Sequence, residues 1–125
     1  MSRAYEFIKE CGVFFILSIN GGAPAGRPFG AIMEYGQDLY ISTSDVKSVY
    51  RQFKENEQIQ IIAIKDDNRS WIRITGVATE CHDMQIKERM LLECPGLTQH
   101  FPTSNTPHFC VFRIRVTNTE MFLND

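Results

Sequence analysis

Three hydroxyl side chains and a lysine stand close together where an expected strand runs into an expected helix. The segment is Leu39 to Lys47, in which Ser42, Thr43 and Ser44 shortly precede the lysine. A helix N-terminus has unpaired N–H groups and a partial positive charge, so it attracts anions. The hydroxyls can donate hydrogen bonds to an anion, and the lysine supplies the opposite charge. The pattern therefore indicates a phosphate site, although a helix cap beside an ordinary surface lysine has the same sequence.

A second candidate segment is Arg27-Pro28-Phe29-Gly30. Proline cannot donate a hydrogen bond to a neighbouring strand, which favours a sheet edge or a bulge. Strand alternation places Arg27 and Phe29 on one face, and Gly30 lets another group approach the backbone closely. These properties suit a flat ligand with an anionic part. An irregular edge strand with an exposed arginine is the alternative interpretation.

The remaining chemically capable residues give weaker patterns. Trp71 begins a regularly alternating segment, where a core or interface position competes with a ligand contact. The three histidines and four cysteines show no spacing typical of a metal site, and the Gly-x-Ser-x-Gly elbow of hydrolases does not occur. We therefore expect no metal ion, and no side chain stands out as a general acid or base.

The elements that must position these segments follow from hydrophobic periodicity. Helical spacing predicts helices over residues 4–11, from Ser44 or Asp45 to about Asn56, and from about His82 to Glu93. Alternating or β-branched runs predict strands over residues 13–19, 27–35, 39–43, 59–64, 70–81, 109–116 and 120–123. Short turns make the early hairpins antiparallel. Because closing a sheet removes its exposed edges, we expect a small barrel with helices at its ends.

Length and composition narrow the classes of function. We expect 125 residues to form one domain, residues 1–125. Thirteen Lys and Arg against fifteen Asp and Glu give a net charge of -2, which argues against nucleic-acid binding by charge alone. No apolar run approaches the ~20 residues that cross a bilayer, and the sequence does not begin like a signal peptide. With well-separated cysteines, we expect a reduced, cytoplasmic protein.

The order of the segments resembles the pyridoxamine 5'-phosphate oxidase-like FMN-binding split-barrel family, specifically its small single-domain members. The resemblance extends from about Tyr5 to Phe122 and rests mainly on three motifs. They are R-P-F-G at residues 27–30, S-T-S-x-x-K at 42–47 and W-I-R-I-T-G at 71–76. It implies a mainly β fold with short helices, a six- to seven-stranded antiparallel split β-barrel. It also implies a homodimer with two FMN molecules at the subunit interface.

The resemblance also implies a role for each motif. The first lies along the flavin ring in this family, which corresponds to Arg27, Pro28, Phe29 and the backbone near Gly30. The second holds the cofactor phosphate, which corresponds to Ser42, Thr43, Ser44 and Lys47. The first residue of the third motif approaches the isoalloxazine, which corresponds to Trp71. Some of these contacts should come from the partner chain, since the flavin lies between the subunits.

Two departures separate this chain from the vitamin B6 oxidase itself. Only Lys47 stands where that enzyme type has an Arg-Lys pair, and the sequence stops at Asp125 without the segment that completes the pyridoxal-phosphate site. We therefore expect an FMN-dependent oxidoreductase other than pyridoxamine phosphate oxidase. It would pass electrons or a hydride from a reduced nicotinamide or another donor to a small acceptor. Such a protein needs no prominent acid or base, because the cofactor carries the electrons.

Nitro compounds are one acceptor class suggested by the resemblance to nitroimidazole-resistance members of the superfamily, and no residue selects them. The alternative is a non-catalytic flavin- or haem-binding protein that serves in storage, sensing or electron carriage. Some split barrels hold haem, a deazaflavin or no cofactor, so a ligand-free dimerisation module is a third interpretation.

Overall fold

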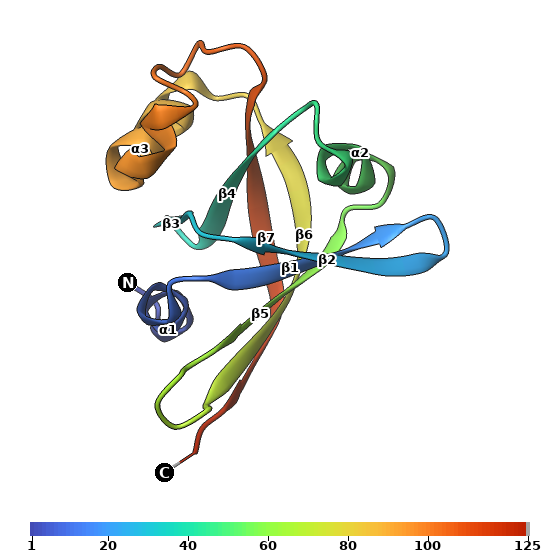
Figure 1. Cartoon of the computed structure of the whole chain (residues 1–125), viewed down its shortest axis with the longest axis vertical. Coiled ribbons are helices and arrows are strands. Elements are labelled where there is room, and N and C mark those ends of the chain that lie inside the picture. Colours follow the sequence, from blue (N-terminus) through green and yellow to red (C-terminus); the bar gives the residue numbers. More distant parts are fainter. Residues whose placement is uncertain (125) are drawn as a thin grey trace.

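The computed structural model describes residues 1–124. In it, seven antiparallel strands form a single sheet, and three α-helices and one 3-10 turn accompany the sheet (Figure 1). The strands lie in the order β2-β1-β5-β6-β7-β4-β3. In chain order the elements are α1 (Arg3–Cys11), β1 (Phe14–Asn20), β2 (Ala23–Phe29), β3 (Ile32–Tyr35), β4 (Asp38–Ser44), α2 (Ser48–Glu55), β5 (Gln58–Ile64), β6 (Trp71–Cys81), α3 (Met84–Glu93), η1 (Pro95–Gln99) and β7 (Phe109–Phe122).

The two edge strands of the sheet, β2 and β3, are neighbours in the sequence. Only Gly30 and Ala31 separate Phe29 at the end of β2 from Ile32 at the start of β3. This connection spans at most about 11 Å, so the two edges must come close together. The sheet is therefore curled into a barrel that is split between β2 and β3. The expected split barrel, with seven strands, is confirmed.

Three predicted strand boundaries are wrong, the first because β2 begins at Ala23 rather than at about Arg27. The strand predicted over residues 27–35 is two strands, because β2 pairs with β1 whereas β3 pairs with β4. The chain changes partners at Gly30, two residues after Pro28, which disfavours a continuous ladder. Conversely, the strands predicted at 109–116 and 120–123 are one long strand, β7, which pairs with β6 from Val111 to Phe122.

The β6–β7 ladder contains a bulge at the glycine that the sequence marks. Thr75 pairs with Asn118 and Gly76 with Val116, so Thr117 is the extra residue. A Cβ at Gly76 would lie 2.8 Å from the carbonyl oxygen of Arg115. Glycine is therefore required here by the close approach of the neighbouring strand rather than by its own dihedral angles.

The barrel interior holds the main apolar core, and α1 and α2 contribute to it. Alternate residues of β1, β5 and β6 point inward, as period-2 strands require, and Ile8 of α1 and Phe53 of α2 join them. A second apolar cluster lies beneath α3 and comprises Met33, Tyr40, Met90, Leu91, Phe109 and Val111. Strand β4 is buried on both faces, because it lies between the two clusters. Within the described residues, no helix is long and apolar enough to cross a membrane.

Candidate functional site

A cavity of about 220 Å³ lies at the split of the barrel, where β2 passes into β3. The connection from β2 to β3 lines it, together with the end of β4, the start of α2 and η1. Seven of the nine residues predicted from the sequence lie here: Arg27, Pro28, Phe29, Gly30, Ser42, Thr43 and Lys47, with Ala31, Val49 and Leu97 added by the fold. Two segments that are separate in the sequence are thus brought to one place by the pairing of β2 with β1 and of β3 with β4.

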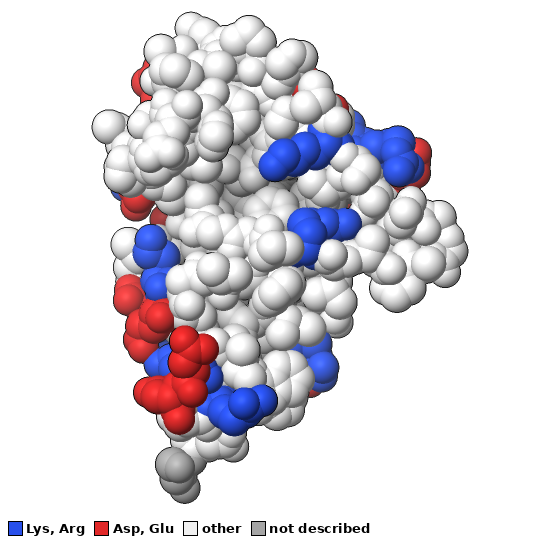
Figure 2. All heavy atoms as spheres, viewed as in Figure 1, with Lys and Arg blue, Asp and Glu red and all other residues white. Residues whose placement is uncertain are grey.

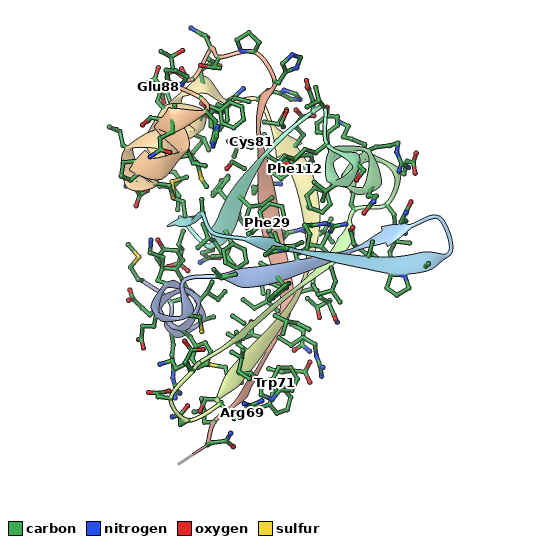
Figure 3. The ribbon with its side chains drawn as sticks, viewed as in Figure 1. Phe29, Arg69, Trp71, Cys81, Glu88 and Phe112 are labelled. Carbon is green, nitrogen blue, oxygen red and sulfur yellow. The ribbon has the colours of Figure 1, made fainter. Side chains whose placement is uncertain are left out.

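The other two predicted residues do not line this cavity. The hydroxyl of Ser44 accepts a hydrogen bond from the backbone N–H of Val46 at 3.4 Å, which stabilises the turn after β4. Trp71 stacks on Phe122 with ring centroids 4.4 Å apart, and Arg73 lies over the Trp71 ring. Figure 3 shows Phe29 near the middle of the molecule and Trp71 toward the far end of the β5–β6 hairpin. Within one chain, Trp71 therefore does not reach the cavity.

The guanidinium of Arg27 is held at the cavity by neutral acceptors. Its Nη1 donates to the carbonyl of Ile16 at 3.0 Å and to the hydroxyl of Ser18 at 2.9 Å, and its Nη2 donates to Oε1 of Gln52 at 2.7 Å. Among residues 1–124 no carboxylate forms an ion pair with it. Burial lowers its pKa from the ordinary value, while an arginine still stays charged. The cavity thus contains a positive charge that the described protein does not neutralise.

Helix α2 starts later than its sequence predicts. Neither Ser44 nor Asp45 is the N-cap: the side chain of Asp45 contacts Nδ1 of His108 at 2.7 Å, and a hydrogen-bonded turn delays the helix to Ser48. Lys47 itself occupies the N-cap position, so it precedes the first turn rather than lying in it. The helix has no side-chain cap and no acidic residue in its first turn. The lysine ammonium and the uncapped N–H groups are therefore both available to an anion.

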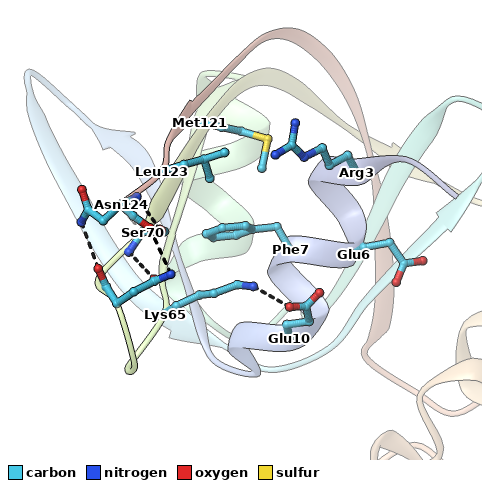
Figure 4. A pocket seen from close by; sticks show the side chains of 10 residues that line it. Arg3, Glu6, Phe7, Glu10, Lys65, Ser70, Met121, Leu123 and Asn124 are labelled. Carbon is cyan, nitrogen blue, oxygen red and sulfur yellow. Dashed lines mark hydrogen bonds and ion pairs between the residues drawn. The ribbon is translucent and has the colours of Figure 1, made fainter.

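A larger cavity of about 340 Å³ lies between α1, the β5–β6 hairpin and the end of β7 (Figure 4). Its basic residues, Arg3 and Lys65, are matched by Glu6 and Glu10, and Lys65 forms an ion pair with Glu10. The cavity at the split has two basic residues and, in the described part of the chain, no acidic residue in its lining. Figure 2 shows Lys and Arg side chains beside a hollow over the region of β2 and α2. Charge therefore favours the split as the site for an anionic ligand.

Other kinds of chemistry find little support in the structure. Among the described residues, no group of three or more His, Cys, Asp and Glu side chains could hold a metal ion. Burial raises the pKa of Cys110 to about 11 and also raises that of Cys94, which keeps both thiols protonated near neutral pH. All four cysteines are free thiols.

Sequence reasoning missed the residues that hold Arg27 in place. Ser18 and Gln52 are both buried, and each occupies an inward-facing position of its element. The available signal is a polar residue on an otherwise apolar face. Ser18 continues the alternation of Phe14 and Ile16, and Gln52 lies three residues after Val49. A polar residue at such a position requires a hydrogen-bonding partner inside the fold.

Comparison with known proteins places this architecture in a family. No protein-family profile and no protein with a curated description matches the chain. Among solved structures, a NimC/NimA family protein from Clostridium acetobutylicum is 31% identical and superposes with a TM-score of 0.86, over 96% of this chain and 89% of that protein. A protein of the pyridoxinephosphate oxidase family from the same organism gives 14% identity and a TM-score of 0.77, over 95% of this chain and 84% of that one.

A third structure shares the fold at lower identity. HutZ, the haem storage protein of Vibrio cholerae, gives a TM-score of 0.76 at 16% identity, over 97% of this chain and 92% of its own. The seven-stranded split barrel is thus common to these proteins, whatever each binds. With 31% identity over nearly its full length, the chain belongs to the NimC/NimA family of the pyridoxamine 5'-phosphate oxidase-like split barrels.

Proposed function

We propose that the protein binds FMN at the split of the barrel and acts as an oxidoreductase. The single observation that supports this most strongly is the cavity itself, where Arg27 and Lys47 meet without an acidic residue among the described lining. A cofactor with a phosphate group matches this cavity in charge, and a flat ring matches the apolar residues Pro28 and Phe29 in its lining. When bound, FMN supplies hydride chemistry, accepting a hydride from a reduced nicotinamide and passing two electrons to a small acceptor.

The residues of the cavity divide into two groups by chemistry. The first group is suited to hold the phosphate: it consists of Lys47, the hydroxyls of Ser42 and Thr43, and the uncapped start of α2. Pro28, Phe29 and the backbone of Gly30 form an apolar strip beside them, suited to the face of the ring. A Cβ at Gly30 would meet no atom within 4 Å, so the space beside this backbone is open.

We propose further that the site is completed by a second copy of the chain. Small-molecule pockets usually enclose about 300–1,000 Å³, more than the cavity of about 220 Å³ in one chain. Exposed apolar side chains lie on the outer face of β1, β5, β6 and β7, around the ion pair of Arg73 with Glu120. They are Phe15 (48% exposed), Ile64 (46%) and Phe122 (39%), with Trp71 beside them. Such a face is typical of a subunit interface. Docking of two such faces would allow Trp71 of each chain to approach the other chain's cavity.

Haem is the competing ligand, because a haem storage protein shares the fold. Haem iron is held by an axial His, Cys, Met or Tyr. The described lining of the cavity includes none of these residue types. The residues that one chain supplies to the cavity therefore favour a phosphate-bearing flavin over haem.

The test is the absorption spectrum of the purified protein before and after addition of FMN and desalting. We expect flavin bands that stay with the protein, and oxidation of NADH or NADPH when a nitro compound or a quinone is added. Retained flavin without turnover would support a storage or carrier role. A Soret band, or loss of all flavin on desalting, would refute FMN as the cofactor.

A further inference from the structure

Two buried polar side chains, Ser18 and Gln52, lie on the inward faces of β1 and α2, which are otherwise apolar. Ser18 of β1 is 1% exposed and Gln52 of α2 is 3% exposed. Their neighbours on the same inward faces are Ile16 and Val49, both apolar and buried. An apolar residue in either place would be the simpler way to fill the barrel, since burying a polar group is unfavourable unless it is hydrogen-bonded. These two residues therefore serve something other than packing.

Both residues bind the same guanidinium and also bind each other. The hydroxyl of Ser18 accepts from Nη1 of Arg27 at 2.9 Å and donates to Oε1 of Gln52 at 2.5 Å, and the same oxygen accepts from Nη2 of Arg27 at 2.7 Å. The result is a closed ring of hydrogen bonds, which fixes the guanidinium more firmly than single bonds would. Three of its five N–H groups are used by the protein, counting the bond to the carbonyl of Ile16.

The chemical nature of the holding groups matters as much as their position. A carboxylate at position 52 would fix Arg27 equally well but would also cancel its charge. An amide, a hydroxyl and a backbone carbonyl fix it and leave the charge in place. We infer that Gln52 and Ser18 are positioning residues that present Arg27 as a fixed, unneutralised cation to the anionic part of the ligand in the cavity. The ligand in this statement rests on the proposed function, whereas the fixing of Arg27 does not.

The test compares Gln52→Glu with Gln37→Glu. Both substitutions replace an amide by a carboxylate of the same shape, and Gln37 is exposed in the turn between β3 and β4. Flavin fluorescence gives the Kd for FMN and for riboflavin, which lacks the phosphate, and circular dichroism gives the melting temperature without ligand. We expect Gln52→Glu to raise the Kd for FMN about tenfold or more, as for the loss of a charge-assisted hydrogen bond.

The melting temperature separates a positioning role from a structural one. The new carboxylate can pair with Arg27, so we expect the ligand-free melting temperature of Gln52→Glu to stay the same or rise while affinity falls. Unchanged riboflavin affinity would show that Arg27 acts on the phosphate, which is the result we expect. A fall in riboflavin affinity as large as that for FMN would show that Arg27 acts on the neutral ring and would overturn the inference. The inference would be overturned if Gln52→Glu binds FMN as tightly as Gln37→Glu does. It would also be overturned if Gln52→Glu loses both FMN affinity and thermal stability.

A measurement without ligand keeps the inference independent of the proposed function. In nitrogen-15 NMR spectra of the apoprotein, we expect resolved side-chain Nη signals for Arg27, showing restricted rotation, and their loss in Gln52→Leu. Free rotation in the natural protein would refute the positioning role, whichever ligand binds. Failure of the natural protein to bind FMN or riboflavin would instead refute the proposed cofactor and leave the NMR result to decide the role of Gln52.

Discussion

Replacement of Lys47 by alanine tests the phosphate half of the site. A hydrogen bond to a charged group contributes about 1.5–3 kcal/mol. Lys47 is exposed, so water and salt screen its charge, and the lower end of that range applies. We therefore expect Lys47→Ala to weaken FMN binding by about 1.5 kcal/mol, which is about tenfold in Kd. The structure predicts no loss of stability, since Lys47 makes no ion pair within residues 1–124.

The assay is titration of apoprotein with FMN, followed by quenching of flavin fluorescence at low salt and again near 1 M salt. Lys9→Ala is the matched control, because Lys9 is an exposed lysine on α1 that does not line the cavity. The difference between Lys47→Ala and the natural protein should shrink at high salt, where the screening length falls to about 3 Å. Riboflavin, which carries no phosphate, should bind both proteins equally and more weakly than FMN binds the natural protein.

Two outcomes would refute this reasoning. If Lys47→Ala and Lys9→Ala bind FMN equally well, Lys47 does not contact the phosphate. If Lys47→Ala loses riboflavin affinity as much as FMN affinity, the lysine acts on the ring or on the fold, and the phosphate lies elsewhere.

Four further predictions follow from the geometry. Gly30→Leu should abolish flavin binding and leave the melting temperature near that of the natural protein, because the added side chain would fill open space at the cavity. The control is Gly22→Leu in an exposed turn, and an equal loss of flavin affinity in this control would contradict the prediction. Gly76→Ala should lower the free energy of unfolding by about 1–3 kcal/mol in urea denaturation, because its Cβ would press on the carbonyl of Arg115, and unchanged stability would show that β7 yields easily. The hydrogen bond from Tyr50 to Glu80, together with burial, raises the pKa of Tyr50 to about 12. The stability that the protonated Tyr50 contributes is therefore fully present below about pH 10 and is lost as the pH rises to about 12. We expect the melting temperature of Tyr50→Phe to fall less than that of the natural protein over this pH range. Trp71 is the sole tryptophan, so tryptophan emission, excited at a wavelength that tyrosine does not absorb, reports on it alone. We expect this emission to be quenched on FMN binding in a dimer, whereas a monomer in sedimentation or unquenched emission would contradict the shared site.

Hydrophobic periodicity was sufficient to predict most helices and strands, but not which strands pair with one another. The alternation of Phe14, Ile16 and Ser18 and the helical spacing before Gly12 lie in elements whose bounds agree with the structure to within a residue or two. The break at Gly30 was not predicted, because residues on both sides of it have strand-forming patterns. A strand ends there only because the next residues find a hydrogen-bonding partner at the opposite edge of the sheet.

The candidate site shows the same division. Residue types alone identified Arg27 and the Ser42–Lys47 segment as able to bind an anion, because charge and hydroxyl groups are local properties. That both line one cavity depends on the closure of the sheet, which joins β2 to β3 and carries β4 beside them. The late start of α2 also depends on a distant contact, since Asp45 is held by His108 from the other end of the chain.

The sequence by itself determined the strand and helix pattern, the class of fold and the chemistry of the candidate residues, because side-chain polarity and spacing act over a few neighbouring residues. The tertiary structure alone decided which of those residues meet. In the folded chain, Ser18 and Gln52 form hydrogen bonds with Arg27, and Trp71 lies against Phe122, away from the cavity of its own chain. Arg27 and Lys47 line that cavity together, with no acidic residue in the described lining. These are properties of long-range pairing, which no local pattern contains.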